Sequence, residues 1–250
     1  MALDPEEKIL ADVFGGAIDP AGVAEAQPVR EIGDTLRARI PIERWDHELI
    51  RDLVPEGSSV LDLGCGRGTL LSCLVRSKKV RGQGVEINPE RGAECVRAGV
   101  PVIQADLDDG ILGYFPDDAF DFVILEKTLQ TVKQPVSVVR EMLRIGHAGI
   151  VSFPNFGHWP VRGALVTEGR APVTRSLPYE WHNTPNIRML TIRDFEEFCE
   201  KNEVHVLSRW VFEGGRYRPL RARDNLLAEE ALYVICDKDK KDRARFTEPQ

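Results

Sequence analysis

The stretch Ser58-Ser-Val-Leu-Asp-Leu-Gly-Cys-Gly-Arg-Gly68 decides the fold of this 250-residue chain. A short apolar run at 60–63 passes abruptly into a loop with glycine at positions 64, 66 and 68, and a helical pattern begins at Thr69. Glycines in such a strand-to-helix turn let the backbone approach a ligand closely and adopt dihedral angles that a β-carbon disfavours. Turns of this kind commonly receive a nucleotide-like cofactor. The sequence therefore predicts a cofactor loop at 64–68.

Strand-like apolar runs and amphipathic helical runs alternate on both sides of this loop. We expect strands at 60–63, 82–87, 100–104, 120–125, 148–153, 204–212 and 232–236. We expect helices at 44–54, 69–76, 90–98, 135–145 and 192–201. Such alternation is typical of a doubly wound α/β fold, in which helices cover both faces of a mostly parallel sheet. The prediction is a seven-stranded Rossmann-like sheet.

The chain divides into parts of different composition. We expect residues 1–40 to be a poorly ordered extension, residues 41–237 to form the α/β domain, and residues 238–250 to be a charged tail. Inside the domain, residues 154–189 contain five prolines, two tryptophans and two histidines with little periodicity. An irregular stretch of that length in a compact domain is typical of a lid or a binding segment.

Composition argues against several classes of function. The formal net charge of −7 disfavours nonspecific binding to nucleic acid, which needs basic surface. Since no apolar run reaches the roughly 20 residues of a membrane helix, and residues 1–7 lack the features of a secretory signal, we expect a cytoplasmic protein. The five cysteines are scattered without a C-x-x-C pair, so we expect neither a disulfide framework nor a metal site.

Two acidic positions fall in register with the glycine loop. Glu86 ends the next expected strand, about 20 residues downstream, where a carboxylate can accept hydrogen bonds from ribose hydroxyls. Asp106 follows the third strand, where it could meet an adenine amino group while Leu107 packs on the ring. In a doubly wound sheet these loops all lie at the carboxyl ends of strands, so they converge on one crevice.

The spacing of the glycines narrows the choice of cofactor. A dinucleotide site has the pattern G-x-G-x-x-G, and the G-x-G-x-G found here makes an NAD-dependent oxidoreductase the least favoured reading. A phosphate-binding P-loop would need G-K-[ST], which this loop lacks. Instead, Leu-Asp-Leu-Gly-Cys-Gly at 61–66 resembles the first motif of class I S-adenosylmethionine-dependent methyltransferases.

This resemblance implies a role for each part of the crevice. Residues 64–66 would pass the methionine part of S-adenosylmethionine, or of its demethylated product S-adenosylhomocysteine, and Asp62 would support the ammonium end. Many methyltransferases carry an acidic residue where this chain has Arg67, which would weaken binding only if its cation pointed inward. The implied cofactor-binding residues are Asp62, Gly64, Cys65, Gly66, Glu86, Ile87, Asp106, Leu107 and Leu125.

Longer motifs are similar to those of one family, the MetW methionine biosynthesis proteins. They lie at 99–108, 115–125, 128–130, 141–146, 150–159 and 177–186. The similarity runs from about residue 44 to about residue 212 and includes the irregular segment. It implies a methyltransferase-like protein that acts with a homoserine O-acyltransferase in making methionine, and it implies no particular methyl acceptor.

The spacing leaves the catalytic residue unassigned. Methyl transfer needs an aligned nucleophile, a water-poor site and in some cases a general base. His158, just past the strand at 148–153, and Tyr179 in the irregular segment are candidates. The favoured alternative for His158 is a packing role, and Tyr179 could equally face a partner protein. Two functions therefore stay open: a non-catalytic partner that binds S-adenosylmethionine, and an active methyltransferase on an unidentified small molecule.

Overall fold

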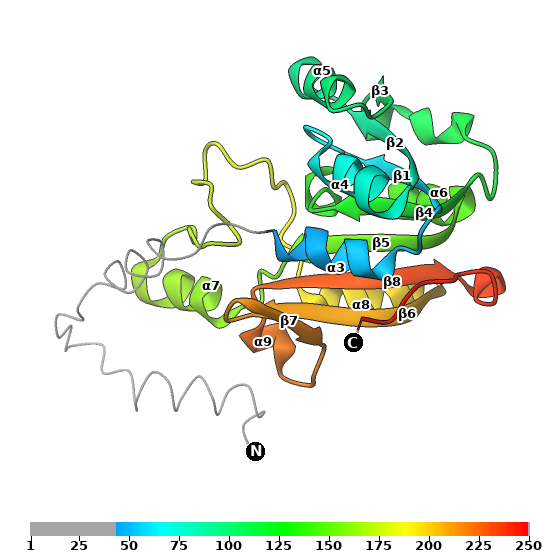
Figure 1. Ribbon diagram of the computed structural model, residues 1–250. Coiled ribbons are helices and arrows are strands. Elements are labelled where there is room, and N and C mark those ends of the chain that lie inside the picture. The colour runs from blue at the N-terminus through cyan, green and yellow to red at the C-terminus, as the bar shows by residue number, and fades with distance from the viewer. Residues whose placement is uncertain (1–43, 250) are drawn as a thin grey trace, which may run out of the picture. The chain divides into compact units, whose positions relative to one another are not determined.

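The computed structural model describes residues 44–249, so the extension predicted at 1–40 lies outside the described residues. These residues build one eight-stranded sheet (Figure 1). Across the sheet the strands are β3 (Val102–Gln104), β2 (Arg81–Glu86), β1 (Ser59–Leu63), β4 (Phe120–Glu126), β5 (Gly146–Pro154), β8 (Glu230–Asp237), β6 (Val204–Glu213) and β7 (Arg216–Pro219). The first five are parallel, and the pairings β5–β8, β8–β6 and β6–β7 are antiparallel. The strand order reverses between β1 and β4, which is where open α/β sheets bind ligands.

Helices cover both faces of the sheet, as the alternation predicted. On one face lie α3 (Trp45–Leu53), α4 (Thr69–Lys78) and α5 (Pro89–Arg97), and on the other lie α6 (Pro135–Ile145) and α8 (Ile192–Lys201). Successive residues of a strand face opposite sides, so Val60 packs with the first group while Leu61 and Leu63 pack with the second. Shorter helical turns are η1 (Leu107–Asp109), η2 (Ile111–Tyr114), η3 (Leu129–Thr131), α7 (Trp159–Gly163), η4 (Ala164–Glu168), α9 (Asp224–Leu227) and η5 (Lys238–Lys240).

The prediction of seven strands is short by one, because it left out the edge strand β7. Its sequence Arg-Tyr-Arg-Pro offers little apolar alternation, and it pairs only with β6. Charged residues and proline are well suited to an exposed sheet edge. The sequence signal for this strand is the Gly214-Gly215 pair in the turn before it. Both glycines have positive φ in the structure (58° and 88°). A Gly-Gly pair between two strands is typical of a tight hairpin.

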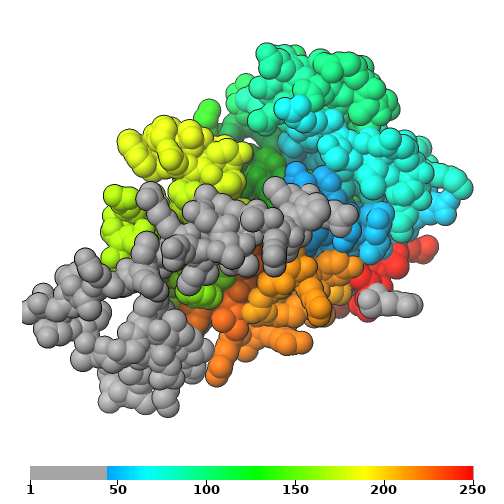
Figure 2. Space-filling model, turned by 60° about the vertical axis from the view of Figure 1, so that its left-hand side comes forward, coloured from blue at the N-terminus to red at the C-terminus, as the bar shows by residue number. Residues whose placement is uncertain are grey.

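The irregular segment after β5 is fastened at its base by Asn155. The side chain of Asn155 is fully buried. Its Nδ2 donates hydrogen bonds to the carbonyls of Asn225 (3.0 Å) and Ala228 (2.8 Å), and its Oδ1 accepts one from the Gly157 N–H (2.9 Å). Past α7 and η4 the chain stays irregular as far as α8. In Figure 2 the yellow-green and yellow atoms of this segment gather on one side of the described chain.

The charged tail after β8 is tied back to the domain. Lys240 Nζ donates to the carbonyls of Leu143 (2.7 Å) and Arg144 (2.8 Å), and the Thr247 N–H donates to the carbonyl of Leu53 (2.9 Å). Within residues 44–249, no helix has both the length and the apolar character needed to span a membrane.

Candidate cofactor-binding site

The loop between β1 and α4 requires its glycines. Gly64, Gly66 and Gly68 have φ of +81°, +57° and +73°, the left-handed region that other residues rarely adopt. The N–H groups of Gly64 and Cys65 both donate to the carbonyl of Val85, at 2.8 and 3.0 Å. These two bonds hold the start of the loop against the end of β2.

The three glycines differ in the space around them. A β-carbon on Gly64 would lie 2.6 Å from Thr128 Oγ1, and one on Gly68 would lie 2.6 Å from Cys95 Sγ. A β-carbon on Gly66 would meet nothing within 4 Å. Gly64 and Gly68 are therefore required for packing within the chain. Gly66 instead leaves open space beside the backbone, as a closely approaching ligand needs.

Glu86 joins the loop to the neighbouring strand ends. Its carboxylate is buried, and Oε2 accepts a hydrogen bond from the Gly66 N–H (2.9 Å) while Oε1 accepts one from the Asn88 N–H (2.8 Å). The carbonyl of Glu86 accepts a further bond from the Ala105 N–H (3.1 Å), which brings in the loop after β3. A carboxylate has about four acceptor positions, so Glu86 can also accept from a bound ligand.

Asp62, near the end of β1, has a carboxylate oxygen that accepts no hydrogen bond from the described residues. It is buried, with 2% of its surface exposed, and its Oδ1 has no hydrogen-bond partner. Burial raises the pKa of Asp62 to about 7, against the attraction of Arg44 and with added repulsion from Glu86. Because buried acceptors are normally paired, this oxygen fits a ligand that brings a hydrogen-bond donor, such as the ammonium group of S-adenosylmethionine.

The turn after β3 is where the sequence predicts contact with adenine. Asp106 caps η1, and its Oδ1 accepts a hydrogen bond from the Asp108 N–H (2.9 Å). Leu107 is half-buried and packs on the core, while the side chain of Ile87 is exposed. This turn adjoins Glu86 through the Ala105 bond, so the predicted convergence of loops is present.

Two other residues predicted to bind the cofactor, Cys65 and Leu125, have buried side chains. Cys65 is buried with its Sγ 3.8 Å from Cys95 Sγ, and burial raises the pKa of its thiol far above the ordinary range. Leu125 is fully buried in the core between the sheet and α6. Arg67 points outward and pairs with Glu94 at 2.6 Å, so its cation does not enter the crevice.

The catalytic candidates are not joined to the glycine loop. His158 precedes α7, and burial lowers its pKa to about 4 although Glu213 opposes this effect. Its Nδ1 is buried without a hydrogen-bond partner among the described residues. Tyr179 is nearly half exposed. Among residues 44–249, no hydrogen bond connects either side chain to residues 64–68.

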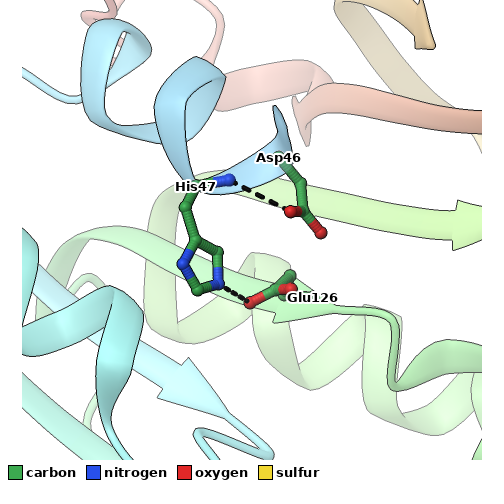
Figure 3. Close-up of side chains that lie close together, drawn as sticks. All are labelled: Asp46, His47 and Glu126. Carbon is green, nitrogen blue, oxygen red and sulfur yellow. Dashed lines mark hydrogen bonds and ion pairs between the residues drawn. The ribbon is translucent and has the colours of Figure 1, made fainter. Parts of the chain in front are cut away.

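An ion cluster that the sequence did not reveal lies at the start of α3 and the end of β4 (Figure 3). His47 Nε2 lies 3.0 Å from Glu126 Oε2, and the His47 N–H donates to Asp46 Oδ1 (3.1 Å). Arg44 also pairs with Glu126, and Lys127 lies 3.5 Å from the Asp46 carboxylate. Lys127 has φ +49°, a strained conformation of the kind found near functional sites.

Two cations, Arg44 and Lys127, lie against the carboxylates of this cluster. Burial lowers the pKa of His47 to about 4, and Arg44 adds to this effect, so the imidazole is neutral at physiological pH. Burial raises the pKa of Asp46, but the attraction of Lys127 and Arg44 outweighs it and the net shift is downward. A divalent cation on Asp46, His47 and Glu126 would have to displace both of these cations. The cluster is therefore a network that joins α3 to the sheet beside Asp62.

The sheet order and the glycine loop define a protein of the class I S-adenosylmethionine-dependent methyltransferase fold, and solved structures agree. A methyltransferase from Thermotoga maritima, described as a possible histamine N-methyltransferase, has a TM-score of 0.57 and 17% identity, covering 84% of this chain and 97% of its own. The [4+2]-cyclase SpnF has a TM-score of 0.52 and 14% identity, covering 92% of each chain. The second likeness illustrates that this fold does not fix one reaction.

The chain belongs to the MetW family of methionine biosynthesis proteins, whose model matches residues 44–235. A relative from Rhodopirellula baltica, the bifunctional methionine biosynthesis protein MetXA/MetW, is 41% identical over 187 residues. The match covers 70% of this chain but only 30% of that protein. In the relative, a region similar to this chain is thus part of a much longer polypeptide.

Proposed function

We propose that the chain binds S-adenosylmethionine or S-adenosylhomocysteine in the crevice between residues 64–68, Glu86 and Asp106. We further propose that it acts in methionine biosynthesis as a cytoplasmic partner of homoserine O-acyltransferase. Family membership supports the pathway, and the joining of MetXA and MetW regions in one relative supports the partner.

The observation that carries the cofactor proposal is the pairing of Glu86 with the Gly66 N–H. The bond fixes a buried carboxylate beside the one glycine of the loop that has open space next to it. The unpartnered Oδ1 of Asp62 lies at the end of β1, directly before the same loop. When bound, S-adenosylmethionine would supply a sulfonium-activated methyl group, while Glu86 would hold hydroxyls and Asp62 would accept from the ammonium.

A pair of glycine substitutions tests the cofactor proposal. Gly66→Ala places a methyl group in the open space where the ligand would approach, so we expect affinity for S-adenosylmethionine to fall at least tenfold in calorimetric titration. Gly57→Ala is the matched control, because Gly57 also has positive φ (+78°) and open space around it, but lies at the other end of β1. Both changes cost about 1 kcal/mol of backbone strain.

The two variants separate a loss of binding from a loss of folding. If Gly66→Ala binds either ligand as tightly as Gly57→Ala does, the cofactor is not in this crevice. Titration with both ligands also identifies which of them the chain prefers.

Analytical size exclusion with purified homoserine O-acyltransferase tests the partner separately, and separate elution of the two proteins at micromolar concentration would contradict the association.

The ion cluster favours an alternative, an active methyltransferase on an unidentified small molecule. His47 is neutral near pH 7 and bonded to Glu126, so the end of β4 next to the crevice carries hydrogen-bonding groups that could orient an acceptor. This alternative predicts that the protein releases S-adenosylhomocysteine when incubated with S-adenosylmethionine and cell metabolites. Release should fall at least tenfold in His47→Ala, while S-adenosylmethionine affinity changes little.

A further inference from the structure

Exposed apolar side chains concentrate in residues 159–189 of the described chain. We call the exposed side chains of this segment the 159–189 surface. Within residues 44–249, twelve large hydrophobic side chains are exposed, and eight of them lie in these 31 residues. Of these eight, Trp181 and Met189 are the most open, at 79% and 78% exposure. The eight are Trp159, Leu165, Val166, Val173, Tyr179, Trp181, Ile187 and Met189. Large exposed apolar patches on soluble proteins often mark interaction sites.

The 159–189 surface is held in place by contacts with the domain. The N–H groups of Ile187 and Arg188 both donate to the carbonyl of Gln130, at 3.0 and 3.2 Å. Leu177 is buried, and the guanidinium of Arg175 lies 5.2 Å from the centre of the Phe212 ring. The apolar groups are therefore presented on an anchored segment, which lowers the entropy cost of binding a partner.

The composition of this surface is that of a protein interface. Residues 159–189 contain two tryptophans, a tyrosine, a methionine and four arginines, but only two glutamates and no lysine or aspartate. Aromatic residues, methionine and arginine are enriched in interface cores, whereas lysine, glutamate and aspartate are depleted. The surface also carries net positive charge in a chain of net charge −7. It fits a partner with an apolar patch and an acidic rim.

We propose that the 159–189 surface is where homoserine O-acyltransferase docks, an inference that rests on the association proposed above. The MetXA/MetW relative joins the corresponding regions covalently, so in that protein the two are always within reach of each other. A second copy of this chain is a poorer occupant. Two identical surfaces meeting face to face would bring their positive charges together.

Substitutions at the most exposed positions test this docking surface in the full chain. The variant Trp181→Ser/Met189→Ser removes the two most open apolar groups of the surface. The control Tyr114→Ser/Val96→Ser removes two exposed apolar groups elsewhere (85% and 59% exposed), on η2 and α5. By titration against purified homoserine O-acyltransferase, we expect the first variant to bind at least tenfold more weakly than wild type and the control to bind within twofold.

A charge reversal tests the same surface without removing apolar area. Arg170→Glu should weaken the association severalfold, and its control Arg91→Glu on α5 should not. Both arginines are exposed. Melting temperatures within about 2 °C of wild type, together with unchanged S-adenosylmethionine affinity, would show that the variants remain folded and that the cofactor crevice is intact.

The outcomes distinguish the surface from the association itself. If wild type does not bind the acyltransferase, the proposed partnership fails. If wild type binds and the surface variants bind equally well, only the docking surface is wrong. Loss of S-adenosylmethionine binding with the acyltransferase still bound would make the segment part of the cofactor site and overturn the inference. Loss of self-association alone, measured by sedimentation, would identify a second copy as the occupant.

Discussion

The glycine loop at 64–68 follows β1, and the segment that carries the 159–189 surface follows β5, a parallel strand of the same sheet on the far side of β4. The two regions are built differently. In the loop, backbone N–H groups of consecutive residues bond to Val85 and Glu86. On the surface, most of the large apolar side chains face outward, and the segment depends on the buried amide of Asn155 at its base.

The two regions differ in how far apart in the sequence the residues that determine their structure lie. The loop depends on dihedral angles that only glycine adopts easily and on short-range spacing, so a few adjacent residues determine its structure. The anchored segment depends on contacts between positions far apart in the chain, such as Asn155 with Ala228. The ligand proposed for the loop is a small molecule, whereas the occupant proposed for the surface is a macromolecule.

The largest expected effect concerns the anchor. Asn155→Ala removes bonds to the carbonyls of Asn225 and Ala228 and to the N–H groups of Gly157 and Ile192, leaving buried polar groups unpaired. At about 1–3 kcal/mol for each unsatisfied group, partly relieved by water, we expect the free energy of unfolding to fall by about 4 kcal/mol. Urea denaturation measures this loss. The control Asn183→Ala, in the exposed part of the segment, should stay within about 0.5 kcal/mol of wild type.

The next effect separates the glycines of the loop from one another. Gly64→Ala adds both left-handed strain and a clash with Thr128, so its unfolding free energy should fall by about 3 kcal/mol. Gly66→Ala, with strain alone, should lose about 1 kcal/mol. Denaturant titrations without ligand compare the two. Equal losses would mean that the loop relaxes around Gly64 and is less tightly packed than the structure indicates.

Sequence alone could predict the loop and the sheet because their signals are local. The alternation of apolar runs identified β1 to β5 and the main helices. The spacing from the glycine loop to Glu86 predicted that both lie at one crevice, and in the structure Glu86 accepts a hydrogen bond from the Gly66 N–H. The placement of Arg67 needed the structure, since a charged residue at a helix start can point either way.

The ion cluster could not be predicted in the same way, because its partners are distant in the chain. His47 and Glu126 are 79 residues apart, and Trp45 donates to Glu230 over 185 residues. The amphipathic pattern of α3 correctly predicted a helix but gave no sign that its first turn carries paired charges. Similarly, no local pattern linked Asn155 to the turn before β8.

A pH-dependent effect of intermediate size tests the buried Asp62. Its pKa is about 7 in the folded chain and about 4 when unfolded. The folded state therefore binds more protons between these values, and stability falls as pH rises. This group alone should lower the unfolding free energy by about 2–3 kcal/mol from pH 5 to pH 8. His47 and His158 act in the opposite direction below pH 6.5, so the measurement is the difference between wild type and Asp62→Asn.

That difference should change mainly between pH 5 and pH 7 and level off above pH 7, with Asp62→Asn losing less stability than wild type as the pH increases. A constant difference from pH 5 to pH 8 would show that Asp62 keeps an ordinary pKa. Its unpaired oxygen would then be satisfied by solvent, and the argument for a ligand donor at this position would lose its basis.

The smallest expected effect lies at the one position where the glycine loop departs from many methyltransferases. Arg67→Glu removes an exposed ion pair and places a second negative charge beside Glu94. This change should lower the unfolding free energy by less than about 1 kcal/mol, and salt should screen the effect. Because Arg67 points away from the crevice, affinity for S-adenosylmethionine should stay within about twofold of wild type in the same titration. A tenfold change in either direction would mean that the side chain turns inward when ligand binds, so that the loop is less fixed than its hydrogen bonds to Val85 and Glu86 suggest.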